Sequence, residues 1–220
     1  MIVVHTISIG QPQDLIDERG PWQSAIFRKP VQGPIALHQH GLEGDQVADT
    51  AHHGSADQAV CCHPLVHYDY WNALYQLETP DRQLGPGSVG ENWTLGGMTE
   101  EDICIGDVFS VGSARVQVSA PRYPCIKQER KLKLPQFHQR TIQTLRTGFY
   151  LRVLIPGIVQ AGDHWILEQR PHPTLTVHRL NGHCHQEFDP LLAQELLAVA
   201  ELGSSWKRVL RIKLEKHGKV

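Results

Sequence analysis

A single cysteine, Cys125, lies in the segment Pro121-Arg-Tyr-Pro-Cys-Ile-Lys127 between two basic side chains, Arg122 and Lys127. Positive charge near a thiol stabilises the thiolate, which is the form that attacks electrophiles and binds soft metals. Pro124 fixes its own φ, so the backbone next to the thiol is held stiff. The alternative interpretation is that Cys125 is an inert, partly buried apolar residue, as most single cysteines near a strand end are.

A second polar group lies in the segment 41–60, which is dense in glycine, aspartate and histidine and contains Asp45, His52, His53 and Asp57. Loops of this composition often carry binding residues. Together with Cys125, these side chains are of the types that bind zinc. However, His52 and His53 are adjacent and not four residues apart as in helical zinc sites, and no second cysteine or histidine lies at the spacing of a zinc finger. His53 activating Cys125 in a cysteine hydrolase is another hypothesis. The two aspartates more commonly cap turns.

The elements that must position these residues are mostly strands. Proline supplies no donor to a sheet, so Pro121 must end the strand before Cys125 or lie at its edge. Helical spacing of apolar residues appears after Pro64 and again at 136–145, where Gly148 is expected to end the helix. Short strands with few helices predict a mainly β fold, a barrel or sandwich. The expected strands are 2–9, 24–33, 34–37, three strands joined by turns in 103–118, 150–155 and 164–168.

The pattern changes after Pro171. Asp189 and Pro190 are typical of a helix start, and Gly203 is expected to end that helix. Ser204 or Ser205 then caps another helix, and 175–180 is expected to form one before them. We therefore expect a β domain at 1–170 and a small helical bundle at 171–220.

Composition narrows the function classes. The 220 residues include 21 basic and 23 acidic side chains, so a general affinity for nucleic acid or for acidic membranes is not expected. Five cysteines without a paired framework favour a reducing cytoplasm, and no apolar run approaches membrane-spanning length. We expect a cytoplasmic protein, and a homodimer is compatible with the sequence.

Several short motifs follow one another along the chain. They are Ser24-Ala-Ile, Gly41-Leu-x-Gly-Asp45, His53-Gly-x-x-Asp57-x-Ala-Val, Gly90-Glu-Asn92, Ile105-Gly-Asp107, Gln117-Val-Ser and Pro121-Arg-x-Pro-Cys125-x-Lys127. In this order they resemble the MOSC-domain family and, within it, the bacterial YiiM-like group. The resemblance extends from the first strands to about residue 165, and the tail, with Ser204-Ser-Trp206, resembles the three-helix domain that follows MOSC in that group.

This resemblance implies a MOSC-type β-barrel-like domain that binds the molybdenum cofactor, a molybdopterin, with Cys125 as the protein ligand to molybdenum. Cationic side chains suit the phosphate of the pterin. The anchors that we expect for it are Arg28, Arg122 and Lys127. Asn92 and His53 offer neutral hydrogen bonds, and Asp45 and Asp57 are expected either to accept hydrogen bonds from pterin N–H groups or to orient their loop.

The resemblance also implies an activity, the reduction of N-hydroxylated compounds such as hydroxylaminopurine base analogues to amines, with two electrons from a flavoprotein reductase. His53 is the expected proton donor, because an unperturbed histidine titrates near neutral pH. The alternative is a carrier that holds the cofactor, or sulfur on Cys125, without turnover. The chain has no room for the pyridoxal-phosphate domain of fused sulfurases, which weighs against a complete sulfurase.

The chain departs from the usual family pattern at three positions. Where the family has His-Gly-Gly-x-Asp followed by Lys or Arg, this chain has Ser55 in place of a glycine and Gln58 in place of the basic residue. We therefore expect a changed affinity for cofactor or substrate. Trp93 replaces the usual aliphatic residue after Glu-Asn.

Overall fold

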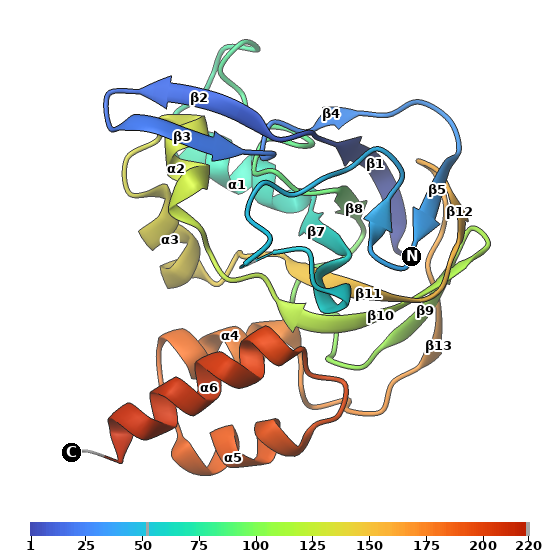
Figure 1. The fold of residues 1–220 in the computed structure, drawn as a ribbon, viewed down its shortest axis with the longest axis vertical. Coiled ribbons are helices and arrows are strands. Elements are labelled where there is room, and N and C mark those ends of the chain that lie inside the picture. Colours follow the sequence, from blue (N-terminus) through green and yellow to red (C-terminus); the bar gives the residue numbers. More distant parts are fainter. Residues whose placement is uncertain (52, 219–220) are drawn as a thin grey trace.

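The computed structural model describes residues 1–51 and 53–218. In this part of the chain, an eight-stranded sheet of order β13-β9-β10-β11-β7-β8-β1-β4 curls around the main core, and only β7 and β8 pair in parallel within it (Figure 1). Its strands are β1 Val3–Ile9, β4 Lys29–Pro30, β7 Val60–Pro64, β8 Trp93–Gly96, β9 Val108–Val111, β10 Ala114–Pro121, β11 Phe149–Ile155 and β13 Ile166–Gln169. The mainly β prediction is confirmed.

Two smaller sheets complete the β part. One is a three-stranded sheet of order β12-β5-β6, and the other is an exposed hairpin of β2 and β3. Their bounds are β5 Ile35–His38, β6 Gly41–Leu42, β12 Gly157–Val159, β2 Gln13–Asp17 and β3 Gly20–Ser24. The hairpin lies in a segment expected to be a polar loop. The expected strand 24–33 is reduced to the two residues of β4, because the chain leaves the hairpin there and turns inward, where Ala25 and Ile26 are buried.

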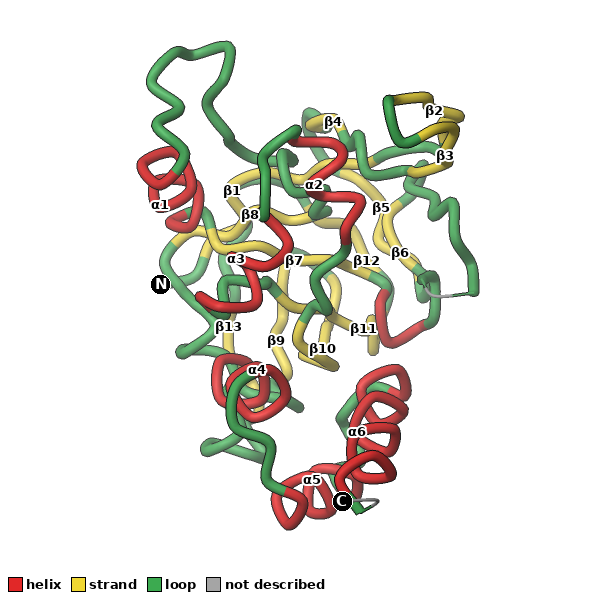
Figure 2. Tube along the Cα trace, turned by 90° about the vertical axis from the view of Figure 1, so that its left-hand side faces the viewer, coloured by secondary structure: helices red, strands yellow, loops and turns green. Residues whose placement is uncertain are grey.

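Helices lie on two sides of the β part. Figure 2 shows α4, α5 and α6 gathered at one end of the molecule. The helices are α1 Val66–Leu74, α2 Ile126–Leu132, α3 Phe137–Thr144, α4 Val177–His185, α5 Pro190–Ala198 and α6 Ser204–His217, with a 3-10 helix η1 Ala56–Gln58. No helix within the described ranges is long and apolar enough to cross a membrane.

Several helix ends differ from the expectations. Helix α3 ends at Thr144, because Leu145 takes a left-handed conformation with φ 57°, so Gly148 is not its terminator. Asp189 caps α5 as predicted, through a 2.8 Å hydrogen bond from the Leu191 N–H, but that helix ends at Ala198, before Gly203. The N-cap of α6 is Gly203, so the prediction that Ser204 or Ser205 caps this helix is wrong.

The core explains how the site is held. On β10, Val116 and Val118 point into the core, whereas Arg115 and Gln117 on the other face are partly exposed. Apolar residues of α4, α5 and α6 belong to the same hydrophobic cluster as those of the large sheet. Burial of this continuous apolar surface fixes β10, and therefore the turn that follows Pro121, against the C-terminal helices.

Candidate functional site

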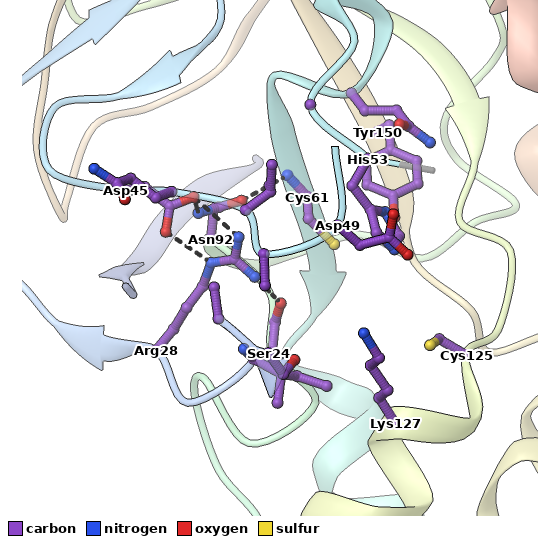
Figure 3. A pocket seen from close by; sticks show the side chains of 18 of the residues that line it. Ser24, Arg28, Asp45, Asp49, His53, Cys61, Asn92, Cys125, Lys127 and Tyr150 are labelled. Atoms are coloured by element: carbon purple, nitrogen blue, oxygen red, sulfur yellow. Dashed lines mark hydrogen bonds and ion pairs between the residues drawn. The ribbon is translucent and has the colours of Figure 1, made fainter. Parts of the chain in front are cut away.

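A cavity of about 390 Å³ lies where β3, β7, β10 and β11 meet the loop before η1 (Figure 3). This volume is in the range of small-molecule sites. Seven of the eight residues that the sequence predicted for the site line it: Arg28, Asp45, His53, Asn92, Arg122, Cys125 and Lys127. The eighth, Asp57, does not. Segments more than a hundred residues apart in sequence therefore converge on one cavity.

Cys125 stands between the end of β10 and the start of α2, where it is the N-cap residue of that helix. Its thiol is partly buried, whereas the other four cysteines are buried. Arg122 lies close enough to interact electrostatically with it, and Lys127 lines the same cavity. Figure 3 shows the sulfur of Cys125 and the ammonium of Lys127 on one side of the cavity. An accessible thiol next to fixed positive charge is suited to act as a thiolate ligand.

Arg28, Asp45 and Asn92 form a connected network on the opposite wall. The guanidinium of Arg28 donates to both carboxylate oxygens of Asp45, with Nε–Oδ1 at 3.0 Å and Nη2–Oδ2 at 2.9 Å. The same carboxylate accepts hydrogen bonds from the Asn92 Nδ2 at 2.9 Å and from the Gly10 N–H at 2.8 Å. Four N–H donors therefore occupy the two oxygens of Asp45, and they tie its loop to Gly10, Arg28 and Asn92.

Arg122 is the buried cation of the site, with an exposed fraction of only 6%. Its Nη2 donates to the Val89 carbonyl at 2.8 Å, and its Nη1 is buried without a hydrogen-bond partner among the described residues. An unmade hydrogen bond from a buried charged group costs free energy, about 1–3 kcal/mol or more. Such a donor at a cavity wall is suited to an anionic ligand.

Gly90 brings two walls of the cavity together. Its φ is +77°, and a Cβ there would lie 2.3 Å from Cγ1 of Ile26. Glycine takes positive φ without steric cost, and no larger residue fits this approach. Next to it, the fully buried Glu91 accepts hydrogen bonds from Tyr68 and Thr94 and fixes the chain that presents Asn92.

His53 and Asp49 reach the cavity from the loop before η1. Figure 3 shows both side chains next to Tyr150 on one wall. The His53 N–H donates to the Asp49 carbonyl at 2.9 Å, which folds the loop back on itself. His52 lies outside the described residues. Within the described ranges, no three His, Cys, Asp or Glu side chains are grouped as they would be around a metal ion.

Asp57 lies between the β part and the C-terminal helices. Its Oδ1 is 2.7 Å from Nη2 of Arg152, and its Oδ2 accepts hydrogen bonds from the N–H and the hydroxyl of Ser204 at 2.9 and 3.1 Å. A carboxylate at a helix N-terminus caps the first turn and is stabilised by its partial positive charge. The cap for α6 thus comes from a residue nearly 150 positions away, which is why its own serines do not cap it.

Cys61 and Tyr150 are among the lining residues that sequence reasoning missed. Cys61 on β7 pairs with Tyr150 on β11, so the two residues lie side by side in the sheet next to the cavity. Burial raises the pKa of the Cys61 thiol and of the Tyr150 phenol, so both stay protonated at neutral pH. Tyr150 lies in an expected strand, whereas the strand that carries Cys61 was not predicted. Gln58 places a neutral amide where the family usually has a cation.

Comparisons with known proteins agree with this architecture. The family model described as "MOSC domain" matches residues 49–165. Protein YiiM of Escherichia coli (strain K12) is 34% identical over 188 residues, which are 86% of this chain and 83% of that protein. The crystal structure of YiiM from Geobacillus stearothermophilus superposes with a TM-score of 0.81 at 31% identity and covers 97% of this chain and 100% of its own.

A further relative is a protein of Gibberella moniliformis named "Reductase". It is 36% identical over 159 residues, which are 72% of this chain but only 28% of that longer protein. Both the family match and the relatives cover most of the curled sheet and the turn that carries Cys125. The chain therefore belongs to the MOSC-domain family, and within that family it is YiiM-like.

Proposed function

We propose that this protein binds the molybdenum cofactor in the cavity and reduces N-hydroxylated compounds, hydroxylaminopurine bases among them, to amines. One observation carries the proposal. The partly buried thiol of Cys125 shares a cavity with Arg122, whose buried Nη1 has no partner among the described residues. A soft sulfur ligand and an unused buried donor for an anion are the two features that a metal cofactor with a phosphate group requires.

The other lining residues fit the same cofactor. Cys125 would hold the metal, and Arg122 with Lys127 would hold the phosphate. Lys127 now donates to the Gln23 carbonyl at 3.1 Å, an exposed contact that its flexible side chain can exchange for a ligand oxygen. Arg28 and Asn92 are committed to Asp45, so they would keep the wall in place and use only their remaining N–H groups for the pterin. Family membership and the relative named "Reductase" support this assignment.

When bound, the cofactor would supply the two-electron redox chemistry that breaks the N–O bond. Reduction of a hydroxylamine to an amine and water consumes two electrons and two protons, so one proton must reach the oxygen that leaves as water and the other must reach the nitrogen that becomes the amine. We assign the first of these transfers to His53, whose imidazole type suits proton transfer near neutral pH. Tyr150, held protonated next to it, is suited to donate a hydrogen bond to the same oxygen. A flavoprotein would supply the electrons.

Turnover of hydroxylaminopurine by protein from a cofactor-producing host tests the proposal, with methyl viologen reduced by dithionite as the electron source. We expect amine formation by the wild type, loss of activity in Cys125→Ser, and a fall in kcat of about a hundred-fold in His53→Gln with the cofactor retained. A wild type that carries the cofactor but forms no amine would contradict the enzyme and favour the carrier of cofactor or sulfur.

A further inference from the structure

The first half of α6 carries a basic surface that the cavity does not use. We call Lys207, Arg208, Arg211 and Ile212 the basic face of α6. Arg208 and Arg211 are exposed, Lys207 is half-buried, and Ile212 among them is 44% exposed. Residues three and four apart lie on the same side of a helix, so these four form one continuous patch. The only acidic side chain of α6, Glu215, lies in its last turn.

The three cations of the basic face are unpaired in the part of the chain that the structure describes. Among the described residues, no ion pair and no side-chain hydrogen bond involves Lys207, Arg208 or Arg211. Protein–protein interfaces commonly have an apolar centre, which loses its water on binding, and a charged rim, which steers the partner. Three unpaired cations around the exposed Ile212 match this composition.

The inner side and first turn of α6, behind the basic face, contact the elements that form the cavity. The Trp206 indole N–H donates to the Pro121 carbonyl at 2.6 Å, at the strand end that precedes Cys125. Ser204 is bound to Asp57, at the end of the loop that carries His53. The ring of Tyr123, which lines the cavity, is 5.3 Å from that of His185, and the ring of His185 is 6.4 Å from that of Trp206. Packed side chains, rather than solvent, therefore separate the face from the cavity.

We infer that the basic face of α6 is the surface to which the acidic flavin domain binds when it delivers electrons to the cavity. This inference rests on the function proposed above. In this step a reduced flavin gives up two electrons, the N–O bond of the substrate breaks, and the products are oxidised flavin, an amine and water. Complementary charge accelerates such encounters and makes them depend on salt.

A nucleic acid is the other polyanion that a basic helix attracts, but the rest of the molecule disfavours it. The chain has a net charge of −2 and an isoelectric point near 6.7, whereas nucleic-acid-binding domains are usually strongly basic. The exposed isoleucine in the middle of the patch also suits a protein surface better than a phosphate backbone.

Two electron donors distinguish an effect on docking from an effect on the chemical step. Methyl viologen reduced by dithionite is small and needs no docking surface. Flavodoxin is an acidic FMN protein that must dock to deliver electrons, and it is kept reduced by its NADPH-dependent reductase. The variants are Arg211→Glu and the double variant Arg208→Glu with Arg211→Glu. The control is Arg82→Glu, which reverses an exposed charge in the segment between α1 and β8; this segment projects from the end of the molecule opposite α6 (Figures 1 and 2).

We expect Arg211→Glu to raise the KM for flavodoxin about ten-fold at low salt, the double variant to raise it further, and added salt to shrink the difference. Activity with methyl viologen should not change in any variant, and Arg82→Glu should behave as the wild type with both donors.

The docking inference is overturned by an unchanged KM for flavodoxin in both α6 variants, by an equal rise in Arg82→Glu, or by a wild type that accepts electrons from viologen but not from flavodoxin. It is also overturned if the α6 variants lose affinity for a 20-base-pair DNA duplex while the KM for flavodoxin stays constant. Absence of turnover with viologen would instead remove the proposed function, and the inference with it.

Discussion

At the scale of single residues, the carboxylate of Asp45 holds one wall of the cavity together. All four groups that contact its carboxylate are hydrogen-bond donors, two on each oxygen. In Asp45→Asn, an amide nitrogen would replace one oxygen and face donors, and Arg28, whose side chain is only 11% exposed, would lose its counter-ion. Removing one partner of a buried pair is strongly destabilising. We therefore expect the free energy of unfolding, measured with urea, to fall by about 3 kcal/mol or more.

The matched control is Asp14→Asn, which makes the same change in an exposed carboxylate that accepts a hydrogen bond from Gln23. A surface substitution of this kind should change the free energy of unfolding by about 0.5 kcal/mol at most. If Asp45→Asn were no more destabilising than Asp14→Asn, the network would not hold the cavity wall.

At the scale of elements, the joint between η1 and α6 predicts a dependence on pH. Burial alone would raise the pKa of Asp57, but the hydrogen bonds from Ser204 and the charge of Arg152 outweigh it and hold the pKa below the usual 3.8. A carboxylate with a lowered pKa stabilises the fold above its unfolded-state pKa, and this stabilisation is lost as the pH falls through the folded-state value. Asp57→Asn should lower the free energy of unfolding by about 1–2 kcal/mol at pH 7.

The difference between the wild type and Asp57→Asn should shrink steadily once the pH falls below about 4, because the wild-type carboxylate then takes up a proton, first in the unfolded state and at lower pH in the folded state. Urea unfolding of both proteins between pH 7 and pH 3 measures this. A difference that stays constant over that range would mean that the charge of Asp57 contributes nothing to the joint.

The elements also show where sequence patterns suffice. The strand before Cys125 was predicted because Val116 and Val118 alternate with polar residues up to a proline, and α5 was predicted from its local Asp-Pro cap. The hairpin β2–β3 was missed because it has little apolar alternation. Contacts from distant residues stabilise it instead, including Arg130, which binds Asp17 with Nη2–Oδ1 at 2.6 Å and lies 4.6 Å above the Trp22 ring.

Most of the candidate site was also predictable from the sequence. Chemical type and motif order pointed to seven residues that the fold brings to one cavity, because motifs record which side chains a site uses. They did not distinguish Asp57, whose partners Arg152 and Ser204 come from other parts of the chain. Tyr150 was missed because a strand residue that lines a cavity has the same pattern as one that fills the core. Cys61 was missed together with its strand, β7, which the sequence pattern did not predict.

At the scale of the whole molecule, one hydrophobic cluster includes both the curled sheet and the C-terminal helices, with Trp206 and Leu210 of α6 packed into it. A shared core predicts one cooperative unfolding transition. Far-UV circular dichroism and tryptophan fluorescence should therefore give the same midpoint in urea. Two separate transitions would show that 1–170 and 171–220 are independent folding units, as the change in sequence pattern at residue 171 suggested.

The central claim is that Cys125 holds a molybdenum cofactor. It is tested most directly by measuring molybdenum and released oxidised pterin in protein from a cofactor-producing host, comparing the wild type with Cys125→Ser and with a control, Cys104→Ser, at a cysteine that does not line the cavity. We expect molybdenum and pterin in the wild type and in Cys104→Ser, and a loss of molybdenum in Cys125→Ser. A wild type with neither molybdenum nor pterin would contradict the account.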